Sequence, residues 1–344
     1  MKRQPHVLFF LFFCTLFNAC ASKLYTTIDI LRPAQIAFPS DVTNILIVNN
    51  SIPQPHSLDH IDMQGDKANF VNVNTDSLAI FCIAALYEDL LQNGFFNHVD
   101  LELNTINTGA DFYQIPSVGQ KDVAGLLTKY DADLLITLDR IRVRDKITDE
   151  FDEFDQLYIS TLEAVYETNW SICDNSGNRH RNLSFTDTLY WDGYGHSVKN
   201  ARAKLPDREN ALIDGALYAG QQTVNRFTPY WEKEDRYFFN PSNKRMKEAM
   251  DAVRSRKWER AIEIWKKILE PDENERLQAF AANNIAIGYE ILGDIDKAID
   301  YATVSFDRFA AVQDVENAMT LQYYLTLLHQ RKNEFELLDR QLGN

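Results

Sequence analysis

Strong positive charge is the first property that this sequence of 344 residues lacks. It has 35 Lys and Arg against 50 Asp and Glu, which gives a formal net charge of −15. Such a surface repels the phosphate backbone of nucleic acids, so we expect no nucleic-acid partner. Glycine and proline are also scarce, at 13 and 10 residues, and 45% of the chain is hydrophobic. This composition excludes a collagen-like or fully disordered chain, and the length allows two domains.

Long hydrophobic runs are missing as well. The run at residues 7–17 (VLFFLFFCTLF) has eleven residues, and no apolar run in the chain reaches 18. A helix needs about 20 residues to span a bilayer. The run follows Lys2 and Arg3, and a short apolar stretch behind basic residues is typical of a secretory signal peptide.

The end of this run, Phe17-Asn18-Ala19-Cys20, resembles the lipobox of bacterial lipoproteins. The resemblance implies cleavage before Cys20 and acylation of that residue, so it predicts a signal peptide at residues 1–19 and a lipid-anchored segment at 20–41. Acyl chains contribute about 0.8 kcal/mol per buried CH₂ and anchor a protein without a membrane-spanning helix. Phe17 and Asn18 depart from the usual box, and an ordinary secretory signal with a chance cysteine is the alternative.

Cysteine is scarce in the mature chain. Of the four cysteines, Cys14 leaves with the signal peptide and Cys20 carries lipid, so Cys82 and Cys173 remain. They can form a disulfide in an oxidising periplasm. However, Cys82 lies on an apolar helix face and Cys173 ends an apolar strand, which favours two separate buried thiols. The mature chain has 33 basic and 50 acidic residues, a formal net charge of −17.

Catalytic and metal-binding signatures are absent from the sequence, which has no GxSxG, Walker or GxGxxG motif. His56 and His60 are four residues apart, a spacing that can bind zinc on a helix, but two prolines just before them indicate a loop. Residues 145–155 (DKITDEFDEFD) hold six acids without the glycine of a calcium loop, and we interpret them as a solvated strand connection. We therefore expect no enzyme activity, metal or cofactor.

Residues 42–239 have the pattern of an α/β domain. The continuous apolar run at 44–49 (NILIVN) is typical of a strand buried on both faces. Apolar residues at helical spacing from Leu78 predict a helix that ends at Asn93-Gly94. The remaining segments predict strands at 98–103, 133–143, 158–173 and 183–191 and helices at 117–130 and 209–227. This order, β-α-β-α-β-β-β-α, indicates a mixed sheet with helices packed on it.

The same order resembles the small α/β domains of periplasmic envelope proteins, such as the amino-terminal domain of TolB and the curli-secretion lipoprotein. The Gly94-Phe95 turn after the first helix and residues 131–136 (DADLLI) carry this resemblance.

Residues 240–344 are rich in helix formers and contain a repeat. Residues 258–265 align with 295–302 at an offset of 37, and the pattern resembles tetratricopeptide repeats. We expect two such units, followed by a capping helix pair at 316–332 and 334–342. The fold class is therefore a mixed-sheet α/β domain followed by an all-α repeat domain.

Such repeats form a concave face that holds peptides or partner proteins in the family. The repeat positions that we single out for partner binding or packing are Asn283, Asn284, Ala286, Tyr289, Gly293 and Ala298. The alternative is that the helices only brace the α/β domain. Residues 229–239 join the two domains, and we expect them to form an inter-domain packing cluster with Arg236 over an aromatic ring. Tyr190, Trp191 and Tyr194 form a candidate aromatic platform for a ligand.

The whole pattern resembles the uncharacterised, tetratricopeptide-tailed lipoproteins of the Bacteroidota. The resemblance rests on Cys20, the strand at 133–136 and the second repeat, and it implies an outer-membrane location. The periplasmic face is favoured over the cell surface because no acidic cluster follows Cys20. We expect a non-enzymatic, lipid-anchored scaffold that holds an unknown envelope protein through its repeat groove and α/β face. The alternative is a lipoprotein that captures glycans or other nutrients.

Overall fold

The computed structural model describes residues 22–342, apart from residues 40, 108, 110, 117, 175–178 and 272. The predicted signal peptide at residues 1–19, the predicted lipidation site Cys20, and Ser117 therefore lie outside the described residues. The described chain forms two compact units. Residues 22–33 and 230–342 make up the helical unit, and residues 34–229 make up the α/β unit. The predicted fold class is confirmed, because a mixed-sheet α/β region is followed by a helical region.

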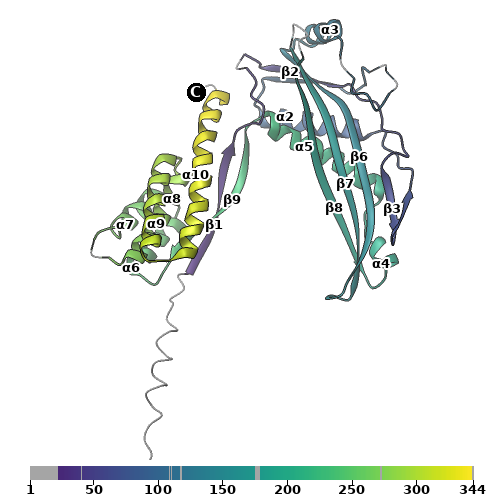
Figure 1. The fold of residues 1–344 in the computed structure, drawn as a ribbon. Helices are drawn as coiled ribbons and strands as arrows, with labels where there is room; N and C mark the ends of the chain where they lie inside the picture. Colours follow the sequence, from purple (N-terminus) through teal and green to yellow (C-terminus); the bar gives the residue numbers. More distant parts are fainter. Residues whose placement is uncertain are drawn as a thin grey trace, which may run out of the picture. The chain divides into compact units, whose positions relative to one another are not determined.

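The α/β unit is built on a mixed sheet (Figure 1), to which seven strands of the described residues contribute. Its strands are β2 (Asn44–Asn49), β3 (His60–Gln64), β4 (Lys67–Phe70), β5 (His98–Glu102), β6 (Leu134–Asp152), β7 (Leu157–Asp174) and β8 (Arg179–Gly195). Strand β2 pairs in parallel with β5 on one side and with the first half of β6 on the other. The second half of β6 pairs with β3, whose hairpin partner is β4. Strands β6, β7 and β8 form a long antiparallel meander.

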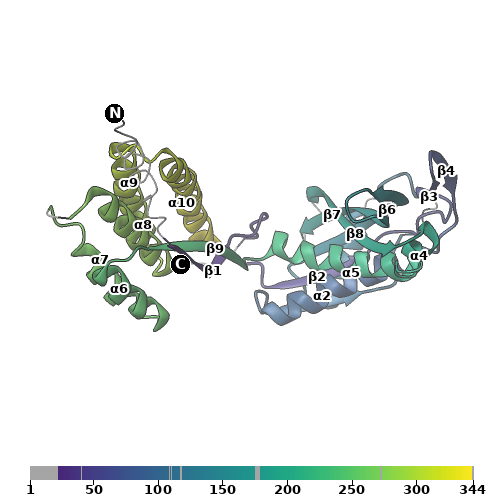
Figure 2. The ribbon, with the colours of Figure 1, turned by 90° about the horizontal axis from the view of Figure 1, so that it is seen from below.

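Helices cover both faces of the sheet where the parallel strands lie. They are α2 (Leu78–Asn93), α3 (Gln120–Tyr130) and α5 (Arg208–Phe227), whereas the short helix α4 (Val198–Arg202) packs on the antiparallel strands β7 and β8. Helices α2 and α5 pack against each other and against one face (Figure 2), where they bury the larger core. Helix α3 covers a smaller core on the opposite face. The second half of β6 extends beyond these helices, and its side chains alternate between buried and exposed, as expected for a sheet with one solvated face.

Helix α5 packs closely because it carries glycine at its contacts. A Cβ atom at Gly220 would lie 2.1 Å from the carbonyl oxygen of Cys82 in α2. A Cβ atom at Gly215 would lie 2.1 Å from the hydroxyl oxygen of Tyr166 in β7. A larger residue at Gly220 therefore requires the main chain to move, and one at Gly215 requires the Tyr166 ring to move.

The helical unit combines a two-stranded ribbon with a stack of helices. Strand β1 (Ser22–Arg32) pairs antiparallel with β9 (Tyr230–Asn240) over the full length of both. The helices are α6 (Lys244–Arg254), α7 (Trp258–Lys266), α8 (Glu275–Ile291), α9 (Ile295–Ala311) and α10 (Val315–Leu342). Helices α6 with α7 and α8 with α9 occupy the two predicted repeats. Where we expected a final helix pair, α10 is one helix of 28 residues, because no glycine or proline interrupts it. Among the described residues, no helix is both long and apolar enough to cross a membrane.

The structure divides the chain differently from the predicted boundaries at residues 41 and 239. Residues 22–32, expected to be part of an anchor segment, form a strand of the helical unit. Strand β9, assigned to the α/β domain by its composition, belongs to the helical unit too. Phe238 and Phe239 are buried in the core of that unit. The α/β unit is thus inserted between two paired strands, and local composition cannot reveal a pairing across 200 residues.

Candidate functional site

The helix face that carries Asn283 and Asn284 is covered by the protein's own strand β9. The Asn284 amide accepts a hydrogen bond from the Phe239 main-chain N–H at 2.8 Å and donates one to the Phe239 carbonyl oxygen at 2.8 Å. The Asn283 amide donates to the Tyr237 carbonyl oxygen at 3.4 Å. Both asparagines are buried. These amides replace a neighbouring strand at the edge of β9, so they bind a segment of the same chain rather than the separate partner we expected.

A buried ion pair also fixes β9 to the helices. Arg236 donates hydrogen bonds to both carboxylate oxygens of Glu290, at 2.9 and 2.8 Å, and the Tyr324 hydroxyl donates to Glu290 at 2.7 Å. Burial alone lowers the pKa of the Arg236 guanidinium, but the carboxylates of Glu290 and Glu234 outweigh burial and raise this pKa. Arg236 lies 5.5 Å from the centre of the Tyr324 ring, which confirms that it sits over an aromatic ring. The expected packing cluster therefore forms within the helical unit.

The other singled-out repeat positions pack the helices. Ala286 and Ala298 are buried in the core of the helical unit. Gly293 has φ +80° in the turn between α8 and α9, a conformation that favours glycine. The ring of Tyr289 stacks on that of Tyr301 with centroids 5.6 Å apart, and the Lys266 ammonium donates a hydrogen bond to the Tyr289 hydroxyl at 2.7 Å.

The expected aromatic platform on β8 is split between two faces of the sheet. Tyr190 and Tyr194 are 62% and 53% exposed, respectively, whereas Trp191 packs against the larger core of the α/β unit. The reason is the twofold alternation of side chains along a strand. On the buried face, a Cβ atom at Gly193 would lie 2.2 Å from the Ala201 carbonyl oxygen of α4. Glycine at this position therefore allows helix α4 to pack closely on the strand. Of the three predicted platform residues, only Tyr190 and Tyr194 lie on the open face.

The two histidines considered for zinc have different partners. His60 lies in β3, where we expected a loop, and it is fully buried with its Nδ1 hydrogen-bonded to Asp145. Arg208 donates to the other Asp145 oxygen at 2.6 Å. His56 instead contacts Asp76 at 2.9 Å. Across the described residues, no group of three or more His, Cys, Asp or Glu side chains is placed to hold a metal ion.

The acidic stretch at residues 145–155 is only partly the solvated connection that we expected. Besides Asp145, Asp149 is paired, since Arg202 of α4 donates to its carboxylate at 2.7 to 3.0 Å. Burial raises the pKa of Asp149, but hydrogen bonds from Arg202 and Ser160 outweigh burial and lower it. These acids fix α4 and α5 to the sheet, and the rest of the stretch forms the exposed tip of the hairpin.

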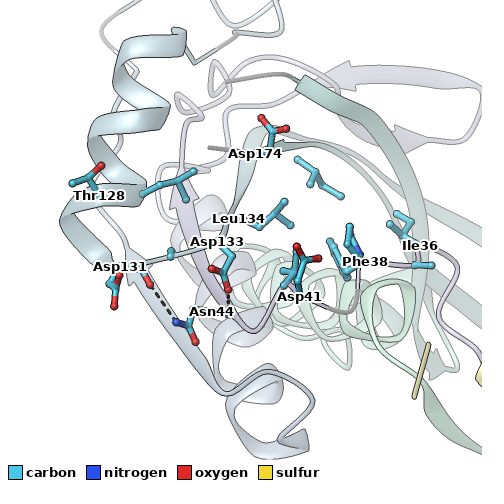
Figure 3. A pocket seen from close by; sticks show the side chains of 15 residues that line it. Ile36, Phe38, Asp41, Asn44, Thr128, Asp131, Asp133, Leu134 and Asp174 are labelled. Atoms are coloured by element: carbon cyan, nitrogen blue, oxygen red, sulfur yellow. Dashed lines mark hydrogen bonds between the residues drawn. The ribbon is translucent and has the colours of Figure 1, made fainter. Parts of the chain in front are cut away.

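A further candidate binding site is a pocket of about 920 Å³ in the α/β unit, at the edge of the sheet where β2 and β6 begin and β7 ends. Its apolar lining comes from Ile36, Phe38, Val42, Leu127, Leu134 and Ile172, and its acids are Asp41, Asp131, Asp133 and Asp174. We call this site the acidic pocket. In Figure 3 the carboxylates of Asp41, Asp133 and Asp174 lie around Leu134. The described residues that line it include no Lys or Arg.

One acid of the pocket is fixed by main-chain hydrogen bonds. The Asp133 carboxylate accepts hydrogen bonds from the N–H groups of Asn44 at 2.8 Å and Thr43 at 2.9 Å. These bonds lower the pKa of Asp133. Asn44 in turn donates its side-chain amide to the Asp131 carbonyl oxygen at 3.3 Å. The negative charge is therefore retained at this edge, and the segment before β2 is tied to the start of β6.

Sequence reasoning missed this pocket because its acids are far apart in the chain. The DADLLI motif identified residues 131–136 only as the start of a strand. A signal was present, since Asp41 and Asp133 precede the parallel strands β2 and β6 while Asp174 ends the antiparallel β7. Strand direction alone places all three acids at one edge of the sheet.

The two cysteines of the described chain are separate buried thiols, as the sequence predicted. Cys82 lies in the larger core and Cys173 in the core on the opposite face of the sheet. The sheet between them excludes a disulfide. Burial and, to a smaller extent, the charge of the nearby Asp187 raise the pKa of the Cys82 thiol.

Comparisons with known proteins match both parts of the chain to families of unassigned function. Residues 247–330, within the helical unit, match the family described as "Domain of unknown function (DUF6340)". A search of curated proteins finds no match. Residues 42–239, more than half of the chain, match "Domain of unknown function (DUF8603)", and the protein belongs to that family.

Proposed function

We propose that this protein is a non-enzymatic, lipid-anchored envelope protein whose acidic pocket holds a basic segment of a partner protein. The observation that carries this proposal is the combination of four aspartates with an apolar lining in one pocket. The repeat face, the other expected binding surface, is covered by β9. Partner binding is therefore assigned to the α/β unit.

The chemistry of the pocket fits Lys and Arg side chains. Such side chains combine an aliphatic stem with a cationic head, and the stem packs on apolar surface while the head stays near charge or water. Ile36, Leu134 and Ile172 are at most 5% exposed and offer an apolar floor. Asp41 and Asp133 are exposed acids at its rim. A peptide with basic residues among apolar ones satisfies both parts of this lining.

The charge of the chain supports the same partner. Residues 20–239 contain 18 basic and 32 acidic residues, so they carry −14 of the −17 charges of the mature chain. A field of one sign accelerates the approach of an oppositely charged partner and repels acidic ones. The association is then expected to weaken as salt is added.

Binding of a designed amphipathic Lys-rich peptide tests the pocket. We expect the double substitution Asp41→Asn and Asp174→Asn to weaken binding about tenfold, since each exposed charge pair contributes up to about 1 kcal/mol. The matched control, Asp66→Asn with Asp155→Asn, removes two exposed acids that do not line the pocket. Fluorescence anisotropy measures both affinities. An equal loss in the control shows attraction by net charge alone, and this result contradicts the proposal.

The proposed anchor is diacylglycerol and a further acyl chain on Cys20, at the periplasmic face of the outer membrane. The support is the lipobox resemblance at residues 17–20. Mass spectrometry of the amino-terminal peptide from membranes should detect these groups, and Cys20→Ala should move the protein from the detergent phase to the aqueous phase. An unmodified amino terminus at another residue contradicts the anchor without affecting the peptide-binding test.

A second candidate function is glycan capture, favoured by the exposed pair Tyr190 and Tyr194 on one face of β8. Aromatic faces stack on sugar rings through apolar contact. We expect any glycan bound here to be lost with Tyr190→Ala and retained with Thr186→Ala on the same strand face. Glycan arrays probed with both variants measure this difference, and an array on which the unsubstituted protein binds nothing removes this candidate.

A further inference from the structure

One end of the helical unit exposes a stripe of large apolar side chains. Val315, Met319 and Tyr323 follow each other at intervals of four along α10, and each is 66% exposed. Residues four apart lie on the same face of a helix. The stripe covers about 12 Å of the helix, given a rise of 1.5 Å per residue, and it begins at the first residue of α10.

The start of β1 adds to this stripe. Tyr25 is 69% exposed, and its ring lies 5.9 Å from that of its cross-strand partner Tyr237. Tyr237 and Tyr323 line the same small cavity, of about 240 Å³. Burial and, to a smaller extent, the nearby Tyr25 and Glu316 raise the pKa of Tyr237 to about 12. The first residues of β1 and α10 therefore lie together, as Figure 1 also shows.

This apolar surface is unexpected on the last helix of a repeat stack. Terminal helices of such stacks usually present a polar outer face. Helix α10 already buries Leu321, Tyr324 and Leu328 against the rest of the unit. The stripe with Val315 and Met319 is a second apolar face, and an exposed apolar patch of this kind marks a contact with a partner or a membrane.

The position of Cys20 identifies what covers this face. Only Ala21 separates Cys20 from Ser22, where β1 begins. Two residues of chain reach at most about 7 Å. The acyl chains of Cys20 therefore hold the start of β1 within the thickness of the lipid headgroup layer.

The charges at this end of the unit are compatible with a lipid surface. Arg276 pairs with Asp314 at 2.7 Å, and Arg245 pairs with Glu273 at 3.2 Å. The Lys23 ammonium lies 4.4 Å from the centre of the Tyr237 ring. These basic groups offset part of the acidic charge at this end, where Glu316 next to Val315 is an exposed acid.

We propose that Tyr25, Val315, Met319 and Tyr323 form a membrane-contact face that lies in the interfacial layer of the leaflet holding the Cys20 lipid. The proposal rests on the proposed acylation of Cys20. Tyrosine is enriched at the depth of the headgroups, and apolar side chains of peripheral helices enter the boundary with the acyl chains. The face then limits how the lipid-anchored helical unit is oriented on the membrane.

Photo-crosslinking from lipid tests this face. The chain from residue 20 onward is coupled through the Cys20 thiol to a maleimide phospholipid in phosphatidylethanolamine and phosphatidylglycerol vesicles that contain a diazirine acyl chain. Cys82 and Cys173 are at most 4% exposed, so coupling is confined to Cys20. We expect crosslinks to concentrate in the peptides that contain residues 22–25 and 312–323.

Substitutions on one helix provide the control. The double variant Val315→Glu and Met319→Glu should reduce crosslinking of residues 312–323 roughly tenfold, because a charged side chain is expelled from the apolar boundary. Leu337→Glu, at a 40% exposed position near the other end of α10, should leave it unchanged. Crosslinks spread evenly over the protein, or crosslinking of residues 312–323 that is unchanged in the double variant, overturn the proposal. Chemical coupling makes this result independent of acylation in cells, which mass spectrometry of the native amino terminus tests separately.

Discussion

Removal of the Glu290 carboxylate is expected to release the ribbon from the helices. Glu290 is 3% exposed and receives hydrogen bonds from Arg236 and Tyr324, while Arg331 lies 3.6 Å from it. Glu290→Leu leaves two buried guanidinium groups without this carboxylate, and such a change costs about 3–5 kcal/mol. Because Arg236 keeps Glu234 at 2.7 Å, we expect a value at the lower end of this range.

Amide hydrogen exchange locates that loss. A cost of about 3 kcal/mol corresponds to exchange more than a hundredfold faster for the amides of β1 and β9, and the unfolding midpoint of the helical unit should fall by roughly 10 °C. The control Glu248→Leu removes an exposed carboxylate 3.5 Å from Arg260, a pair that contributes at most about 1 kcal/mol. A loss below 1 kcal/mol in Glu290→Leu refutes the assigned role, as does equally faster exchange throughout the α/β unit.

Three further substitutions or treatments test the α/β unit. Gly220→Ala should destabilise the unit by about 1–3 kcal/mol, since the new Cβ meets the Cys82 carbonyl oxygen at 2.1 Å. Gly125→Ala in α3, where a Cβ atom meets no atom within 4 Å, should stabilise it by up to about 1 kcal/mol. Thermal unfolding should show a lower midpoint for the first variant and a higher midpoint for the second. The pKa of Asp133 is lowered in the folded protein, so its carboxylate stabilises the fold at a pH above the ordinary pKa of 3.8. This stabilisation is lost as the pH falls through the lowered pKa. The urea midpoints of wild type and Asp133→Asn should therefore differ at pH 7 and converge near pH 2. In the Cys20→Ala chain, the raised pKa of Cys82 should keep it unreactive toward iodoacetamide at pH 8 until the protein is denatured, and mass spectrometry counts the alkylated thiols.

Elements with strong local signals were predictable from the sequence. The helix from Leu78 ends at Asn93, and Gly94 follows it with φ +64°, as the Asn-Gly pair indicated. Glycine there costs nothing in a conformation that other residues avoid. The apolar run at residues 44–49 is the central parallel strand β2 and is buried on both faces. In each case the determinant is a few adjacent residues.

Features that depend on distant partners were missed. Prolines before His60 indicated a loop, yet residues 60–64 form a strand because β6 extends far enough to pair with them. The sequence predicted Trp191 as part of an aromatic platform, but the register of β8 places it on the buried face. The sequence indicated Asn284 only as a position of the helical repeat. The packing of β9 shows that its amide hydrogen-bonds to the main chain of Phe239. Sequence spacing specifies neither register nor the strand that fills a groove.

The assignment of the predicted binding activity changes once β9 is seen to cover the repeat face. The asparagines of the helix stack bind the protein's own main chain, which is why the partner site is proposed in the other unit. The first strand after Cys20 belongs to this same helical unit, so the proposed lipid anchor adjoins it. The acidic pocket belongs to the other unit, inserted between Arg32 and Tyr230. The proposed anchor and the proposed partner site therefore belong to different units, and substitutions that abolish one should leave the other intact.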